Sequence, residues 1–191
     1  MLPGFRDTLI LDEETEIDET YVNAGSKGRN KRGGKGRIRG RKGRGRGSYD
    51  TDRPPVFTIK GRETGVVIYR AERNVRSKTV KKVARAHIKL GNIVYTDDFR
   101  SYWVLEKLYK RRIVRHSKGI YATGIINING AESENLSFKI FLMPRRGVSK
   151  ECLDEYCACA TIWANIYAMS PRGALFRLFC WLFRANQRRN I

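Results

Sequence analysis

The chain has 191 residues, of which 41% are hydrophobic, so it is long enough to bury one core and does not belong to the disordered class. Its 39 Lys and Arg against 19 Asp and Glu give a formal charge of +20, which predicts a polyanionic partner, nucleic acid ahead of an anionic membrane surface. No apolar stretch approaches the roughly 18 residues of a spanning helix and the first residues show no signal-peptide pattern, so we expect a cytoplasmic, nucleoid-associated protein.

Residues 16–22 predict the first β-strand, because β-favouring side chains alternate there with acidic ones. Asp18 lies in the middle of this run and shares a face of the strand with Glu16 and Thr20. A carboxylate on a strand in the centre of a sheet is costly to leave unpaired. Asp18 therefore either finds a cation or belongs to an edge strand.

The composition inverts after this strand. Residues 25–47 hold eleven Lys or Arg, nine Gly and no acid, which predicts a mobile basic loop that binds nucleic-acid phosphates. The predicted nucleic-acid contacts are the cations of this loop and two residues of a later polar segment: Lys27, Arg29, Lys31, Arg32, Lys35, Arg37, Arg39, Arg41, Lys42, Arg44, Arg46, His116 and Lys118.

Ordered structure is predicted to resume as a hairpin. Residues 56–60 and 64–70 are two β-favouring runs joined by a short turn, and with the first strand they predict a three-stranded antiparallel meander. Ser77 is then expected to cap a helix with an apolar stripe at helical spacing. His87 lies on that stripe, and we interpret it as a packed histidine at the edge of the core.

Residues 92–96 predict a short buried strand that ends at Asp97 and Asp98. Because the order strand, helix, strand is a crossover, this strand should run parallel to its neighbour in the sheet. A carboxylate at the C-terminal end of such a strand lies where α/β sheets place their ligands. The helix predicted to follow offers the same aspartates an alternative, purely structural role as its N-cap.

The remainder of the chain is predicted to be mostly helical, with a possible fifth strand at residues 111–115. A helix from residue 131 to about 143 carries three apolar side chains on one face: Leu136, Ile140 and Met143. Ser149 is expected to cap the next helix and Ser170 the last one. We therefore predict a core of residues 1–144, interrupted by the basic loop at residues 24–53, and a C-terminal helical extension of residues 145–191.

The four cysteines, Cys152, Cys157, Cys159 and Cys180, are all late in the chain. Two thiols spaced two residues apart on a helix point in different directions, and the sequence offers no pair with zinc-site spacing. We interpret the cysteines as reduced, packed thiols and expect no bound zinc.

The predicted elements follow the ribonuclease-H-like order, an α/β class in which a mixed sheet, an antiparallel meander plus parallel strands, is flanked by helices. In that order one acid lies on the first strand, one just after the fourth and one on a later helix. Here these acids would be Asp18, Asp97 and Glu132. Three such carboxylates can hold two Mg²⁺ or Mn²⁺ ions, which activate water or a 3′-hydroxyl and stabilise the leaving oxygen of a phosphodiester.

Glu132 has an alternative interpretation. Asn129 and Glu132 also fit a capping-box-like helix start, with Asn129 as N-cap and Glu132 at the third helical position. Glu134, two residues farther on, faces elsewhere on the helix and is a weaker candidate. Spacing alone leaves the third acid open.

Four segments resemble, in order and roughly in spacing, the motifs of an insertion-sequence group of DDE transposases. They are residues 16–22 (EIDETYV), 94–102 (VYTDDFRSY), 116–121 (HSKGIY) and 129–132 (NGAE). The resemblance covers about residues 14–156 and implies a ribonuclease-H-like catalytic core with Asp18 and Asp97 as metal-binding aspartates. It implies Glu132 as the third ligand, with Asn129 at a position that some members use instead.

The resemblance also implies two divalent cations, DNA partners at the element ends and at the target, and a homo-oligomer on paired ends. Members usually carry a zinc ribbon before the core, and we expect none here. Residues 157–160 also replace the more polar pattern expected there. Two explanations are open: a truncated or inactive copy, or recognition of the ends by another chain.

Two other functions are compatible with the composition. A non-catalytic basic DNA- or RNA-binding protein would explain the charge, with the acids in structural roles. Another ribonuclease-H-like nuclease would share the layout of strands and acids, and only the wording of the motifs argues against it.

Overall fold

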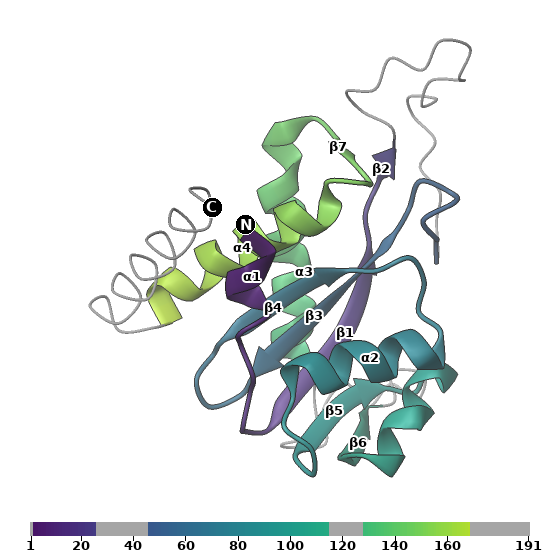
Figure 1. Ribbon diagram of the computed structural model, residues 1–191, viewed down its shortest axis with the longest axis vertical. Coiled ribbons are helices and arrows are strands. Elements are labelled where there is room, and N and C mark those ends of the chain that lie inside the picture. The colour runs from purple at the N-terminus through teal and green to yellow at the C-terminus, as the bar shows by residue number, and fades with distance from the viewer. Residues whose placement is uncertain (1, 26–45, 115–127, 169–191) are drawn as a thin grey trace, which may run out of the picture.

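The computed structural model describes residues 2–25, 46–114 and 128–168 (Figure 1). Its strands are β1 (Thr15–Tyr21), β2 (Ala24–Gly25), β3 (Pro55–Gly61), β4 (Val67–Ala71), β5 (Ile93–Asp97), β6 (Lys110–Val114) and β7 (Val148–Ser149). Its α-helices are α1 (Leu2–Arg6), α2 (Ser77–His87), α3 (Asn129–Leu142) and α4 (Leu153–Ala168), and its 3₁₀-helices include η1 (Arg100–Lys107) and η3 (Met143–Arg145). Most of the basic loop, His116, Lys118 and the helix expected after Ser170 lie outside the described residues.

Five strands form one mixed sheet in the order β4-β3-β1-β5-β6. β1, β3 and β4 pair antiparallel, which confirms the predicted meander. β5 runs parallel to β1, and β6 runs parallel to β5. This is the ribonuclease-H-like arrangement that the sequence predicts, and it makes β1 the central strand. Asp18 therefore does not lie on an edge strand.

Helices cover both faces of the sheet (Figure 1). On one face, α2 and η1 pack over a core that includes Ile17, Ile59 and Val94. On the other face, α3 and α4 pack over a second core built around Val56 and Tyr69. Because successive residues of a strand point to opposite faces, β3 and β4 each contribute to both cores.

The structure confirms some of the local expectations. His87 is fully buried on α2, so its interpretation as a packed histidine is confirmed. The segment after β5 is helical, but it forms the 3₁₀-helix η1. Ser149 does not cap a helix: it pairs with β2 in β7, and α4 begins at Leu153. The division of the chain between residues 144 and 145 stays a prediction, and α4 packs closely against β4 and α1.

The apolar face expected on α3 is exposed. Leu136, Ile140 and Met143 are 60%, 55% and 71% exposed, whereas the positions that face the sheet are Ala131, Asn135 and Phe138. The helix is therefore oriented by a different set of contacts from those that its hydrophobic pattern indicates.

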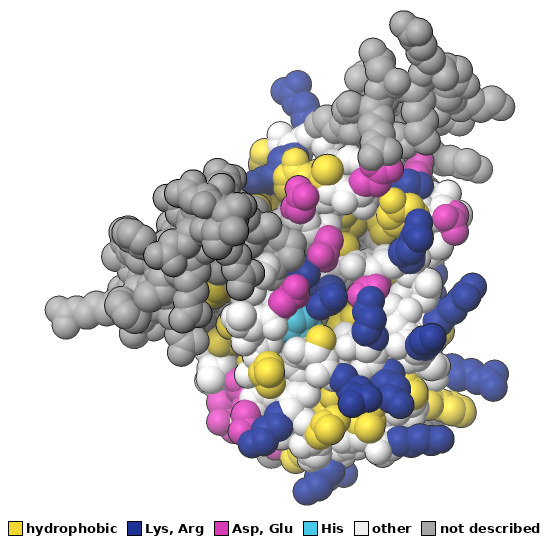
Figure 2. Space-filling model, viewed as in Figure 1, with side chains coloured by type: hydrophobic (Ala, Val, Ile, Leu, Met, Phe, Trp, Pro, Cys, Tyr) yellow, Lys and Arg dark blue, Asp and Glu magenta, His cyan; other side chains and the backbone are white. Residues whose placement is uncertain are grey.

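Lys and Arg side chains gather on the face of the molecule around α2, as Figure 2 shows. This helix alone carries Lys78, Lys81, Lys82 and Arg85, and its first turn has no acid. In the described part of the chain, no helix is long and apolar enough to cross a membrane.

Candidate active site

Asp18 and Asp97 lie on the neighbouring parallel strands β1 and β5. In the register of β1 with β5, Thr15 pairs with Val94 and Glu16 with Tyr95. The same offset, carried two residues farther along both strands, sets Asp18 level with Asp97. Adjacent strands are roughly 4.8 Å apart and level residues of a parallel pair share a face, so the two carboxylates project together. They do so near the C-terminal end of β5, toward the side of the sheet that α3 covers.

The end of β5 is held by two groups. The Oδ1 atom of Asp97 accepts a hydrogen bond from the backbone N–H of Phe99 at 3.0 Å, which is the local capping contact expected for an aspartate at this position. The buried guanidinium of Arg111 donates to the backbone oxygen of Asp97 at 2.8 Å and to Thr96 Oγ1 at 2.8 Å. These contacts fix the backbone position and the side-chain orientation of Asp97.

Asn135 on α3 holds the carboxylate of Asp18. Its Nδ2 donates to Oδ2 of Asp18 at 2.7 Å, and its Oδ1 accepts from the hydroxyl of Thr58 at 2.6 Å. Thr58 is the partner of Asp18 in the β1–β3 register. Since a carboxylate only accepts, the amide nitrogen must face Asp18, which defines the orientation of the amide. One buried amide thus joins α3 to both central strands.

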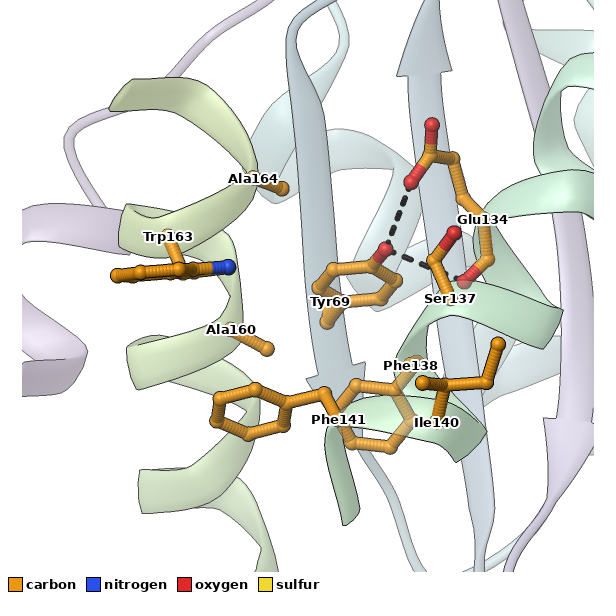
Figure 3. Close-up of a pocket in the computed structure, with 9 residues that line it drawn as sticks. All are labelled: Tyr69, Glu134, Ser137, Phe138, Ile140, Phe141, Ala160, Trp163 and Ala164. Carbon is orange, nitrogen blue, oxygen red and sulfur yellow. Dashed lines mark hydrogen bonds between the residues drawn. The ribbon is translucent and has the colours of Figure 1, made fainter. Parts of the chain in front are cut away.

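Glu134 serves a structural role on the opposite flank of α3. Its carboxylate accepts from Lys60 Nζ at 3.0 Å and from the hydroxyl of Tyr69 at 2.9 Å, and thereby ties α3 to β3 and β4. Figure 3 shows the Tyr69 hydroxyl pointing at Glu134, beside a hollow between α3 and α4. Its engagement there leaves Glu134 away from β5 and Asp97.

Glu132 lies on the other flank. Two positions along an α-helix correspond to a rotation of about 200°, so a helix that directs Glu134 toward β3 directs Glu132 toward β5. Glu132 is exposed in the first turn of α3. Asn129, the first residue of the helix, is also exposed. Its side chain is rotated about 60° farther around the helix axis, away from the sheet, than that of Glu132. The N-cap position is Ile128, so the predicted cap at Asn129 is wrong.

The three predicted acids do not all converge. Asp18 and Asp97 come together, while Glu132 remains on the exposed flank of α3. Among the described residues, no three His, Cys, Asp or Glu side chains are grouped closely enough to hold a metal ion. The donor chemistry nevertheless suits Mg²⁺ or Mn²⁺, because the paired groups offer carboxylate oxygens and neither nitrogen nor sulfur.

Sequence reasoning missed Glu19, which lies beneath the aspartates on the other face of the sheet. Its Oε2 accepts from the hydroxyl of the buried Tyr102 at 2.5 Å. Burial raises the pKa of Glu19 to about 7, and the charges of Asp18 and Asp97 add to this shift. Burial also raises the pKa of Tyr102, with the charge of Glu19 as the next cause. An acid on the same strand face as Ile17 was the signal that could have revealed it.

Arg46 brings the end of the basic loop to the acids. Its guanidinium lies over the ring of Phe99, 3.4 Å from the ring centroid, and Phe99 follows Asp97 by two residues. Of the predicted nucleic-acid contacts, Arg46 is the one within the described residues. Its charge also lowers the pKa of Glu19, which is consistent with its position beside the acidic groups.

Comparison with known sequences identifies a family for this chain. Residues 10–158 match the model of the ISXO2-like transposase domain. A protein in the transposable element ISH50 of Halobacterium salinarum is 35% identical over 173 residues, which cover 86% of this chain. The chain spans 56% of the length of that relative. Among solved structures, a chain in the simian T-cell lymphotropic virus intasome complex matches with a TM-score of 0.45 and 10% identity, over 80% of this chain and 48% of that one.

Proposed function

The chain belongs to the ISXO2-like family of DDE transposase domains, and from this premise we propose that it cleaves DNA at the ends of an insertion element and joins them to target DNA. Hydrolysis of a phosphodiester would be followed by in-line attack of the freed 3′-hydroxyl on the target. The chain spans about half the length of its curated relative. Its action at the ends of the element is therefore part of what we propose.

The observation that supports this proposal is the β1–β5 register, because the Glu16–Tyr95 pairing, continued for two residues, would bring Asp18 level with Asp97. Two carboxylates on neighbouring central strands repel each other, and a fold retains such a pair at low cost when a cation shares it. A surface that served only to bind phosphates would have no use for paired acids. A divalent cation, when bound, would polarise the phosphodiester and lower the pKa of the attacking water or hydroxyl.

Each of the residues around the acids would have a separate role in the reaction. Asp18 and Asp97 would supply the ligand oxygens, and Asn135 would fix the orientation of the Asp18 carboxylate through its hydrogen bond to Oδ2. Arg111 would keep the end of β5 in register through the backbone oxygen of Asp97. Arg46, beside Phe99, would contact a phosphate near the acids.

We propose Glu132 as the third ligand. Glu134 is engaged with Lys60 and Tyr69 on the far flank of α3, and Asn129 lies farther from the sheet than Glu132. A change of side-chain rotamer at the exposed Glu132, combined with occupation of the site by the cation, would bring its carboxylate toward Asp97. Long acidic side chains have this reach, whereas the shorter Asn129 does not.

A second candidate function rests on the net charge of +20 and on the capping contact of Asp97. A non-catalytic DNA-binding protein would use the cations and would keep the aspartates only for structure. It predicts DNA binding without metal-dependent cleavage, which separates it from the first proposal.

The test is metal-dependent cleavage of a pre-nicked duplex that carries the terminal repeats read from DNA flanking the gene. Asp18→Asn and Asp97→Asn should each abolish cleavage in Mn²⁺ while DNA binding stays within about twofold. The matched control is Asp12→Asn, which removes an exposed carboxylate paired with Lys89 and should cleave normally. Binding without cleavage by the unmutated chain would favour the second candidate.

A further inference from the structure

A cavity of about 480 Å³ opens beyond the C-terminal end of β1. It lies between that strand, the second half of α3 and the segment that leads into β7. Its lining includes Tyr21, Asn23, Arg53, Lys139, Met143 and Val148. Two of the lining side chains are cations and none is an acid. The charged side chains of the lining are therefore all positive, in contrast to the acidic pair of Asp18 and Asp97.

Arg53 is the distinctive member of this lining. Its Nε atom is buried and has no hydrogen-bond partner among the described residues. Buried donors are nearly always satisfied, and a charged donor is especially costly to leave without an acceptor. The backbone holds Arg53 in place: its N–H donates to Ser48 O at 3.0 Å, and a side chain at Gly47 would collide with its Cβ atom. An anion in the cavity would supply the missing acceptor.

The spacing of residues along β1 and α3 relates this cavity to the acids. β1 ends at Tyr21, three residues beyond Asp18, which is about 10 Å along the strand, although the Tyr21 side chain itself points to the face of Glu19. Lys139 follows Glu132 by seven residues on α3, which is two turns along the same flank and again about 10 Å. The cavity and the acidic pair thus lie on one path between β1 and α3.

We propose that this cavity binds a backbone phosphate of the DNA strand whose scissile phosphodiester lies at Asp18 and Asp97. At about 3.4 Å of axial rise per nucleotide, a separation of about 10 Å corresponds to roughly three nucleotides. Arg53 would contact the phosphate through its guanidinium, and Lys139 would add a second, mobile charge. The location of the scissile bond rests on the proposed function, whereas the phosphate site itself does not.

The test measures binding of a fluorescein-labelled 20-base-pair duplex by the full chain, in EDTA, over a series of NaCl concentrations. Each phosphate contact contributes about 0.9 to the slope of log affinity against log salt. Arg53→Gln and Lys139→Gln together should lower the slope by about that amount and the affinity severalfold. The matched control is Lys78→Gln, an exposed cation on α2 on the other side of the sheet, and it should lower the slope less.

If Arg53→Gln fails to fold, Lys139→Gln, at an exposed position, decides the question by the same criterion. An unchanged slope in the folded variants would overturn the proposal. Displacement of the duplex by inorganic phosphate from the wild type, with no change of slope in the variants, would identify a site for free anions and would also overturn it. A reduced slope in a chain that cleaves no DNA would retain the phosphate site and reject the catalytic function.

Discussion

The side-chain amide of Asn135 on α3 donates a hydrogen bond of 2.7 Å to Oδ2 of Asp18 on β1. Its carbonyl oxygen accepts from Thr58 on β3, so the amide is fixed at both ends. The same residue fixes how α3 lies on the sheet, because a rotation of the helix would break both bonds. The orientation of Asp18 and the position of Glu132 are therefore coupled through one buried side chain.

Replacement of Asn135 by alanine should test this coupling. The change leaves the Thr58 hydroxyl and one oxygen of Asp18 without their partner, so unfolding should require about 1–3 kcal/mol less free energy. Cleavage should fall more than DNA binding does, and part of the loss should be recovered at high Mn²⁺, because a less ordered carboxylate binds the cation more weakly. Urea denaturation and cleavage rates across a Mn²⁺ series measure the two effects.

Ser137→Ala is the control for this change, since Ser137 is exposed on the same helix and bonds only to the backbone oxygen of Ser133 among the described residues. It should alter neither stability nor metal dependence. Loss of stability in Asn135→Ala with a wild-type Mn²⁺ dependence would mean that the amide only supports the fold.

Binding of a divalent cation should stabilise the wild-type chain and not its aspartate variants. Asp18 and Asp97 repel each other without the cation, so Asp18→Asn should leave the melting temperature in EDTA unchanged or higher. Mn²⁺ at 100 times its dissociation constant should add about 2.7 kcal/mol to the wild type and far less to the variant. Thermal melts with and without Mn²⁺ measure both.

Asp97→Ala separates the capping contact from the metal role. This variant loses the bond to the Phe99 N–H, which Asp97→Asn keeps, and should be about 1 kcal/mol less stable than Asp97→Asn. In the thermal melts with Mn²⁺ described above, equal stabilisation of the wild type and of Asp18→Asn would mean that the cation binds away from Asp18.

His87 predicts a loss of stability in acid. Its Nδ1–H donates to Leu9 O at 3.0 Å, and its Nε2 accepts from Arg70 Nη1 at 3.2 Å, so the buried ring is neutral. Burial lowers its pKa, with the charges of Arg70 and Arg6 acting in the same direction, while the hydrogen bond to Leu9 O and the charge of Asp7 oppose this shift. Because the unfolded pKa is about 6.5, the stability due to neutral His87 is present above that pH and is lost as the pH falls below it.

The measurement is the free energy of unfolding of wild type and His87→Gln at pH 7.5 and pH 5. The variant should be less stable at pH 7.5 and should lose less on acidification. Glu19 acts with the opposite sign, because its raised pKa of about 7 favours the folded state at low pH, and this stability is lost as the pH rises from the unfolded pKa of about 4.3 through 7. Glu19 is present in both proteins, so its contribution cancels when the stability loss of His87→Gln on acidification is subtracted from that of the wild type. Equal losses in the two proteins would exclude His87 as the cause.

The strand order could be predicted from sequence because its signals lie within short segments: alternating residue types in the strands, turn residues in the hairpin, and a helix between two strands that must then run parallel. The places of Asp18 on β1 and of Asp97 at the end of β5 could be predicted for the same reason, since each lies at a recognisable point of a strand, and their role as metal ligands stays a prediction. The inward position of Asn135 could not, because hydrophobic periodicity assigns a polar residue to the solvent face and its partners are more than 70 residues away. The pair of Glu19 and Tyr102 was missed likewise, because it depends on how η1 packs beneath the sheet.

The choice between Glu132 and Glu134 gives the sharpest test of the site, since both are acids on one helix. Glu134→Gln weakens the ion pair with Lys60 and the bond from Tyr69, so it should cost about 1 kcal/mol of stability and leave cleavage nearly intact. Glu132→Gln keeps the length of the side chain and removes its charge at an exposed position, so it should change stability less than Glu134→Gln does and abolish Mn²⁺-dependent cleavage. Cleavage retained by Glu132→Gln and lost in Asn129→Ala would transfer the third role to Asn129. Cleavage lost only in Glu134→Gln would require α3 to rotate when the cation binds, against the two bonds that Asn135 makes to the sheet.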